Sequence, residues 1–166
     1  MEFLDILMEN GNKIGTASRK KCHDGSFLLH GVVHVLVFND SGDILLQKRS
    51  VNKDIEPCKW DTSVGGHILS GESVHEALIR ETKEELGISD TVFIEMYTFI
   101  IKSDVEREYV TTFRCVWNGP IRYPEDEIAE VSFFKHEEIE SLLGSGLFTH
   151  AFETDWKKYK EWEKNT

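Results

Sequence analysis

A predicted helix from about Val74 to Leu86 constrains this chain more than any other feature of its sequence. Ser73 and Glu76 form a capping box at its start, and Gly87 follows its last apolar residue. On a helical wheel with ~100° per residue, one continuous face is apolar, and we expect it to be buried; it consists of Ala77, Val74, Leu78, Thr82, Leu86 and Ile79.

Three glutamates of this helix lie where the packing face should be. Glu81 falls at ~340° and Glu85 at ~20° on the wheel, inside the apolar arc, and Glu84 lies on its edge at ~280°. A charge run usually forms a solvated face with i,i+4 ion pairs, but these acids point to the wrong side for that explanation. Like charges repel, and a buried carboxylate without a partner costs on the order of several kcal/mol. A bound dication would remove both penalties, and carboxylate oxygens suit Mg²⁺ or Mn²⁺.

The residues around these glutamates complete a motif of 23 residues, from Gly66 to Ile88. It resembles the Nudix box of the Nudix hydrolase superfamily, and the soft departure is Thr82, where the family usually has a larger apolar residue. The resemblance implies an α+β Nudix fold, in which a mixed β-sheet in an α/β/α sandwich carries the box as a loop-helix-loop. The matching positions are Gly66, Glu72, Arg80, Glu81, Glu84, Glu85, Gly87 and Ile88.

The same resemblance implies a role for each residue of the box. Glu72 pairs with Arg80, and Arg80 orients Glu81. Glu72 and Gly87 are structural. The divalent ions, Mg²⁺ or Mn²⁺, are held by Glu81, Glu84, Glu85 and a backbone carbonyl near Gly66.

The implied reaction is metal-dependent hydrolysis of a phosphoanhydride bond in a nucleoside diphosphate linked to another moiety. Metal ions that bridge the pyrophosphate oxygens neutralise the charge that repels an attacking water, and they lower the pKa of that water. The general base stays open. A box glutamate, Glu81 or Glu84, can serve, and so can a glutamate of another loop, for which Glu127 and Glu125 are the candidates.

From about Gly15 to Trp117 the order of features is also similar to the type I isopentenyl diphosphate isomerases, which share the Nudix fold. This second resemblance implies basic residues that grip the substrate diphosphate, Arg49 and Lys53, and we place Arg19 with them. It also implies a second metal site, chemically sensible for a transition metal, made of His23, His30, His67, Glu106 and Glu108.

Two departures argue against isomerase activity. The isomerases carry a proton on a cysteine where this chain has Gly65, and a glycine offers no proton carrier. The isomerases also tend to have a degraded box, whereas this one is intact. We therefore expect a hydrolase of the isomerase-like branch. The alternatives are an isopentenyl diphosphate delta-isomerase-like protein and a non-catalytic Nudix-fold binding module, although such modules typically lose box glutamates.

The composition sets the remaining expectations. The 166 residues, 40% of them hydrophobic, suit one Nudix domain over residues 1–166. A net charge of -11 argues against nucleic acid as a partner and favours a small-molecule diphosphate bound through metal ions or a local basic patch. The first residues show no basic stretch followed by an apolar run, the chain has no membrane-length apolar run, and its three cysteines form no CxxC pair. These patterns predict a cytoplasmic protein without membrane contact. Similar proteins commonly dimerise, so a homodimer stays open.

The rest of the sequence predicts strands with two later helices. Asn10-Gly11 is a strong hairpin signal between the first two strands. The expected strands are 3–8, 13–16, 32–38, 44–47, 92–101, 108–117 and 128–134, and the expected later helices are 137–143 and 151–163.

Overall fold

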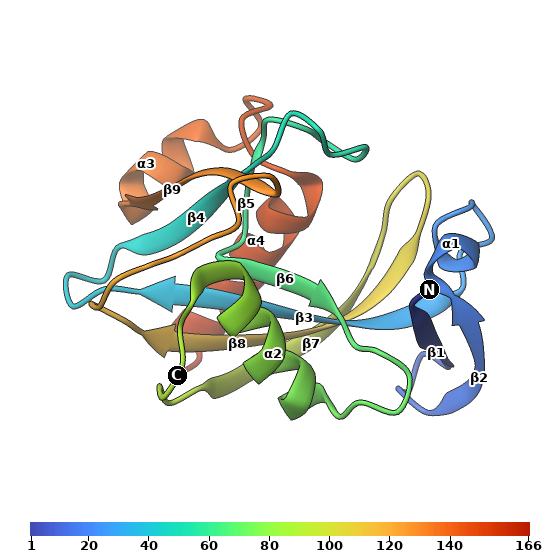
Figure 1. Cartoon of the computed structure of the whole chain (residues 1–166). Helices are drawn as coiled ribbons and strands as arrows, with labels where there is room; N and C mark the ends of the chain where they lie inside the picture. Colours follow the sequence, from blue (N-terminus) through green and yellow to red (C-terminus); the bar gives the residue numbers. More distant parts are fainter.

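A nine-stranded sheet runs through the computed structural model, which describes residues 1–166 (Figure 1). Its centre is β3 (Leu29–Phe38), a strand in which all ten residues are buried. β3 pairs antiparallel with β6 (Val64–His67) and parallel with β8 (Arg107–Val116). The sheet is therefore mixed, as predicted, and the burial of β3 on both faces explains its continuous apolar sequence.

The other strands extend the sheet on both sides of β3. β1 (Phe3–Leu7) and β2 (Lys13–Ser18) form the predicted first hairpin. β7 (Ile94–Lys102) pairs antiparallel with β8. β4 (Ile44–Arg49) pairs with the end of β3, with β5 (Trp60–Asp61) and with β9 (Ile128–Phe134).

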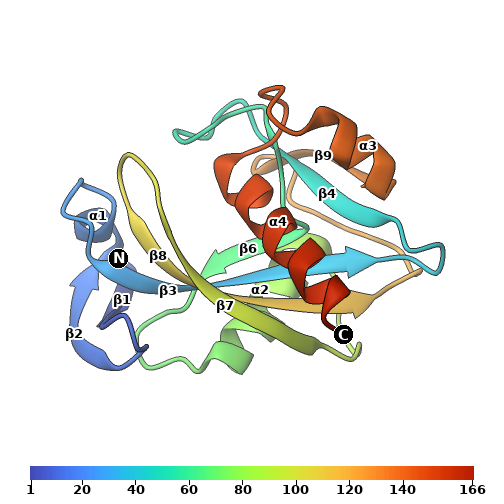
Figure 2. The ribbon, with the colours of Figure 1, turned by 180° about the vertical axis from the view of Figure 1, so that it is seen from behind.

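Helices cover both faces of the sheet. α2 (Val74–Leu86) lies on one face, and α4 (His150–Lys164) crosses the other, as the view from behind shows (Figure 2). Successive residues of β3 alternate between these layers, because side chains alternate along a strand. The odd-numbered Val33, Val35 and Val37 share a core cluster with Leu78 and Leu86 of α2. The even-numbered Leu36 and Phe38 share another cluster with Phe152 and Trp156 of α4.

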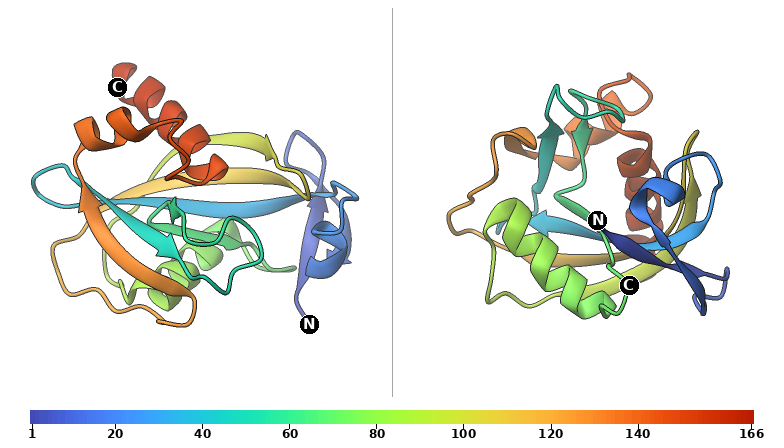
Figure 3. Two further views of the ribbon diagram at one scale, coloured as in Figure 1. Left: turned by 90° about the horizontal axis from the view of Figure 1, so that it is seen from above. Right: turned by 45° about the vertical axis from the view of Figure 1, so that its right-hand side comes forward.

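Two smaller helices complete the fold. α3 (His136–Leu142) follows β9 and lies near α4, while α1 (Arg19–Cys22) lies beside the N-terminal hairpin (Figure 3). The arrangement is the predicted α/β/α sandwich of the α+β class. No helix is long and apolar enough to cross a membrane.

The box helix has its predicted bounds. Ser73 and Glu76 form the capping box, and Gly87 ends the helix in the left-handed conformation with φ 67°. The predicted buried face was wrong at Val74 and Ile79, which are 37% and 47% exposed. Val74 is the first residue of the helix, and Ile79 lies at the margin of the predicted arc. The buried positions are Ala77, Leu78, Thr82 and Leu86.

The sequence patterns did not predict α1, β5 or β6. Each has at most four residues, which is too short for a periodic pattern. β6 also contains Gly65 and Gly66, and glycine is depleted in strands. Tertiary pairing with β3 creates this strand.

Candidate active site

Arg80 on α2 connects the parts of the box. Its Nε and Nη2 donate to the two carboxylate oxygens of Glu72 at 2.7 and 2.9 Å, and its Nη1 donates to Glu81 at 2.7 Å. Nη2 also donates to the carbonyl oxygen of His67 at 3.0 Å, and Glu84 lies 3.3 Å from Nη1. The hydrogen bonds from Arg80 lower the pKa of Glu72. Arg80 therefore joins the loop before the helix to two glutamates of the helix.

Glu81 and Glu85 are partly buried carboxylates on the same side of α2. Glu85 accepts a hydrogen bond from Gln47 Nε2 at 2.8 Å and another from the backbone N–H of Gly65 at 3.2 Å. Burial raises the pKa of Glu81, and it raises the pKa of Glu85 well above the usual range, with the charge of Glu81 adding to the second shift. The arrangement thus gathers acids whose charged forms are disfavoured without a cation.

Gly66 lies directly against Glu81. A Cβ atom at position 66 would stand 2.1 Å from the Glu81 carboxyl carbon, so any side chain there would displace the carboxylate. The glycine therefore lets the backbone of β6 approach the carboxylates of α2 closely. Partly buried acids beside exposed backbone fit a hard divalent cation, which prefers carboxylate and carbonyl oxygens.

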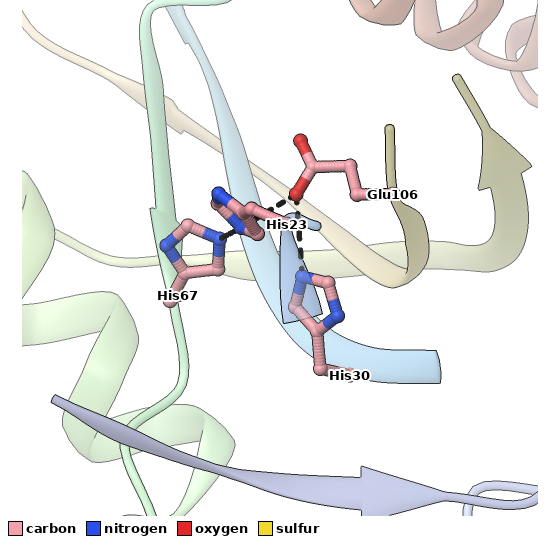
Figure 4. A group of neighbouring side chains, drawn as sticks. All are labelled: His23, His30, His67 and Glu106. Carbon is pink, nitrogen blue, oxygen red and sulfur yellow. Dashed lines mark hydrogen bonds and ion pairs between the residues drawn. The ribbon is translucent and has the colours of Figure 1, made fainter. Parts of the chain in front are cut away.

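A second polar cluster lies at the other end of β6, and its side chains point toward one another (Figure 4). The ligand atoms of His23, His30, His67 and Glu106 all lie within 4.8 Å of one another. His23 Nε2 is 3.1 Å from His67 Nε2 and 2.6 Å from Glu106 Oε2, and His30 Nε2 is 3.5 Å from the same oxygen. His23 directly follows α1, His30 and His67 belong to β3 and β6, and Glu106 lies in the turn between β7 and β8.

The protonation of this cluster suits a metal ion. Burial, together with the neighbouring His30 and His23, lowers the pKa of His67 to about 3, so its ring is neutral at pH 7 and keeps its lone pair. Burial alone would raise the pKa of Glu106, but contacts with His23 and His30 lower it. His30 Nε2 is buried without a hydrogen-bond partner, and the buried Glu106 Oε2 faces the imidazole nitrogens of His23 and His30. Buried polar atoms normally have partners, so this donor set fits a transition-metal ion.

Glu108 lies beside this cluster but outside its four ligand atoms. Burial raises the pKa of Glu108 well above the usual range, and the charge of Glu106 adds to the shift. The sequence grouped Glu108 with the ligands, and the structure places it next to them as a carboxyl that favours its protonated form.

Both clusters open into one cleft of about 650 Å³. The box acids and Gly66 line it, and so do Glu106 and Glu108. The basic residues assigned to the diphosphate, Arg19, Arg49 and Lys53, line the same cleft, as does the candidate base Glu127. The other loop candidate, Glu125, does not line it.

The sequence patterns assigned no role to Gln47 or Asp61, which also line the cleft. Gln47 holds Glu85, and Asp61 accepts hydrogen bonds from Arg49 at 3.2 Å and from Thr149 at 2.9 Å. The signal for Gln47 was a buried polar residue directly after the apolar run Ile44 to Leu46 in β4. Asp61 stands in a two-residue strand, where no pattern could indicate its role.

The NUDIX domain family matches residues 28–152, which include the whole box. This chain belongs to the Nudix family. A Nudix hydrolase of Listeria monocytogenes, described as uncharacterised, is 35% identical over 156 residues, which cover 92% of this chain and 90% of the relative. A similarly described Nudix hydrolase of Yersinia pestis is 36% identical over 139 residues, which cover 84% of this chain and 76% of the relative.

Solved structures share the Nudix fold. A Deinococcus radiodurans protein superposes with a TM-score of 0.77 at 22% identity, and the match covers 89% of this chain and 92% of the other. The Nudix domain of NrtR from Shewanella oneidensis, solved with ADP ribose, superposes with a TM-score of 0.63 at 16% identity and covers 85% and 90% of the two chains. The likeness to isopentenyl diphosphate isomerases stays a prediction.

Proposed function

We propose that this Nudix hydrolase cleaves a phosphoanhydride bond in a nucleoside diphosphate linked to another moiety. Its divalent ions, Mg²⁺ or Mn²⁺, would be held by Glu81, Glu84, Glu85 and a backbone carbonyl near Gly66. The observation that carries the proposal is the gathering of partly buried carboxylates with raised pKa values in a cleft that basic side chains also line. With a net charge of -11, the protein would bind an anionic substrate through these cations together with the basic side chains of the cleft.

The protein's own residues provide the binding and the proton transfer. When bound, divalent ions neutralise pyrophosphate charge and lower the pKa of water. Arg80 orients Glu81, while Gln47 and the Gly65 backbone orient Glu85. The diphosphate is gripped by Arg19, Arg49 and Lys53.

We assign the general base to Glu84. Its side chain is 60% exposed, and its one contact is the 3.3 Å approach of Arg80, so it is free to take a proton from water. Glu81 is held at 2.7 Å by the same arginine and is less free. Glu127 is the alternative base, because it lines the cleft from a separate loop. Glu127→Gln decides between them, because Glu84 is also a proposed metal ligand and its substitution should lower kcat in either case. If Glu84 is the base, Glu127→Gln should retain kcat, whereas a fall of about 100-fold or more would assign the base to Glu127.

The substrate class has one further support. The Shewanella domain was solved with ADP ribose, which is a nucleoside diphosphate joined to a sugar. We test the class with ADP ribose, nucleoside diphosphate sugars, dinucleotides and nucleoside triphosphates, each with Mg²⁺ or Mn²⁺. The readout is the inorganic phosphate that an added phosphatase liberates from the products. A folded enzyme that hydrolyses none of these compounds with either ion would contradict the proposal.

The histidine cluster supports a second proposed metal site and a second candidate function. His23, His30, His67 and Glu106 would hold a transition-metal ion, with Glu108 beside it. Such a site favours isopentenyl diphosphate isomerisation. That reaction uses a cysteine thiol to carry a proton, and this chain has Gly65 at the matching position. We therefore expect isopentenyl diphosphate to exchange no protons with solvent. Deuterium from D₂O in the recovered compound would reverse the ranking of the two functions.

A further inference from the structure

A polar row crosses the sheet on the face that α4 covers. His34 of β3 is paired in register with Gly65 of β6 on one side and with Thr112 of β8 on the other, and Thr112 is paired with Tyr97 of β7. Residues paired in this way present their side chains to the same face of a sheet. Asp155 of α4 reaches this row and is fully buried. None of these five residues belongs to the box or to the histidine cluster.

Asp155 orients the imidazole of His34. One of its oxygens lies 2.7 Å from His34 Nδ1, Thr112 Oγ1 donates to it at 3.1 Å, and the Tyr97 hydroxyl donates to the other. A carboxylate only accepts hydrogen bonds, so Nδ1 carries the hydrogen in this pair. In the neutral ring, Nε2 then holds the lone pair. Burial of a carboxylate is costly unless hydrogen-bond donors satisfy it, and here three donors do so. The carboxylate in turn holds the imidazole of His34 in one orientation.

The free nitrogen of His34 faces the cleft through a gap in β6. His34 is only 4% exposed, yet it lines the same cleft as the box glutamates, and its Nε2 makes no hydrogen bond within the protein. A Cβ atom at Gly65 would lie 3.5 Å from His34 Cδ2 and 3.8 Å from Nε2. Because glycine has no Cβ, the edge of the ring is open. The backbone N–H of the same glycine donates to Glu85, so the opening adjoins the proposed metal ligands.

The chemistry of Nε2 selects its partner. An acceptor nitrogen gains nothing from a deprotonated phosphate oxygen, which is also an acceptor, but it binds an O–H group. We propose that His34, oriented by Asp155, is a further substrate-contacting residue whose Nε2 accepts a hydrogen bond from an O–H group in the cleft. The O–H belongs either to a hydroxyl of the moiety linked to the diphosphate or to the attacking water. The inference rests on the proposed function, and it adds a contact that the box does not contain.

Two substitutions remove the contact in different ways. His34→Asn retains an N–H that can donate to Asp155 but has no atom at the position of Nε2. Gly65→Ala leaves the histidine intact and covers the ring edge with a methyl group. The methyl group fits, because the atom nearest to it, Thr62 Oγ1, would be 3.4 Å away. Gly15→Ala is the matched control, since no atom lies within 4 Å of a Cβ at that exposed strand position.

The kinetics distinguish the two sources of the O–H group. We compare ADP ribose with P²-ethyl ADP, whose linked group has no hydroxyl. If the moiety supplies the O–H, both variants raise KM for ADP ribose about tenfold more than they raise KM for P²-ethyl ADP, as expected for one lost hydrogen bond. If the water supplies it, both variants lower kcat about tenfold for both compounds. Parameters equal to those of the Gly15→Ala control in both variants would overturn the proposal.

A labelling experiment tests the open ring edge without turnover. Diethyl pyrocarbonate modifies accessible imidazole nitrogens, and peptide mass spectrometry separates the seven histidines. His34 should be labelled in the wild type, as should the exposed His75, and Gly65→Ala should protect His34 alone. If the folded wild type leaves His34 unlabelled while His75 reacts, the inference is wrong. If His34 is labelled but no nucleotide is hydrolysed, the proposed function fails while the accessible His34 is supported.

Discussion

Arg80 donates hydrogen bonds to both carboxylate oxygens of Glu72, from Nε at 2.7 Å and from Nη2 at 2.9 Å. The pair connects the loop that precedes α2 to the second turn of this helix, and the third nitrogen of the guanidinium, Nη1, donates to Glu81. A planar guanidinium presents two parallel N–H groups that match the two carboxylate oxygens, and a lysine ammonium has no such pair. The relationship therefore couples the shape of the loop to the position of a proposed metal ligand.

This ion pair predicts how stability depends on pH. The pKa of Glu72 is lowered in the folded protein, so its contribution to stability is present above the ordinary glutamate pKa and is lost as pH falls through the lowered value. We expect Glu72→Gln to lower the free energy of unfolding at pH 7, and we expect the difference from the wild type to shrink as the pH is lowered. Urea unfolding at a series of pH values measures it. A difference that stays constant down to the acid range would contradict the prediction.

Glu85→Gln should separate activity from stability. The substitution removes a charge from the proposed metal site with little change of shape, so we expect turnover to fall at least ~100-fold. The free energy of unfolding without metal should stay the same or rise at pH 7, because the raised pKa of Glu85 means that its ionised form is unfavourable in the fold. Steady-state kinetics and thermal unfolding give both values. Glu95→Gln, at an exposed strand position, is the control, and full activity in Glu85→Gln would exclude Glu85 as a ligand.

Removal of divalent ions should abolish hydrolysis. The proposed site holds acids whose negative charge repels an anionic substrate, so the apoprotein should be inactive in excess EDTA and should recover when Mg²⁺ or Mn²⁺ is added in excess of the chelator. Phosphate release before and after the addition measures the effect. Hydrolysis that continues at full rate in EDTA would remove the metal mechanism.

The histidine cluster should bind its own metal ion. Isothermal titration of the wild type with Mn²⁺ or Zn²⁺ should reveal a site that His30→Gln weakens by at least ~10-fold, because one of the four donors is lost. His75→Gln, an exposed position on α2, should bind as the wild type does. Equal binding by His30→Gln and the wild type would leave the cluster as a purely structural hydrogen-bonding group.

The box helix could be predicted from the sequence because its signals are local. The capping box of Ser73 and Glu76, the left-handed Gly87 and the spacing of the glutamates all act within a few residues, so the pattern alone determined the bounds of α2. The same wheel placed Glu81 and Glu85 toward the packing side, and both are partly buried. The family resemblance, which rests on the same spacing, supplied the fold.

Only the tertiary structure decided which distant residues meet. His34 and Asp155 are 121 positions apart, and their contact depends on the register of β3 and on how α4 packs across it. The histidine cluster likewise joins four elements, and resemblance rather than pattern grouped its members. Short-range hydrogen bonds and periodicity determine a helix. A contact across a sheet depends instead on pairing and packing between distant segments, and the local pattern of one segment does not identify its partner.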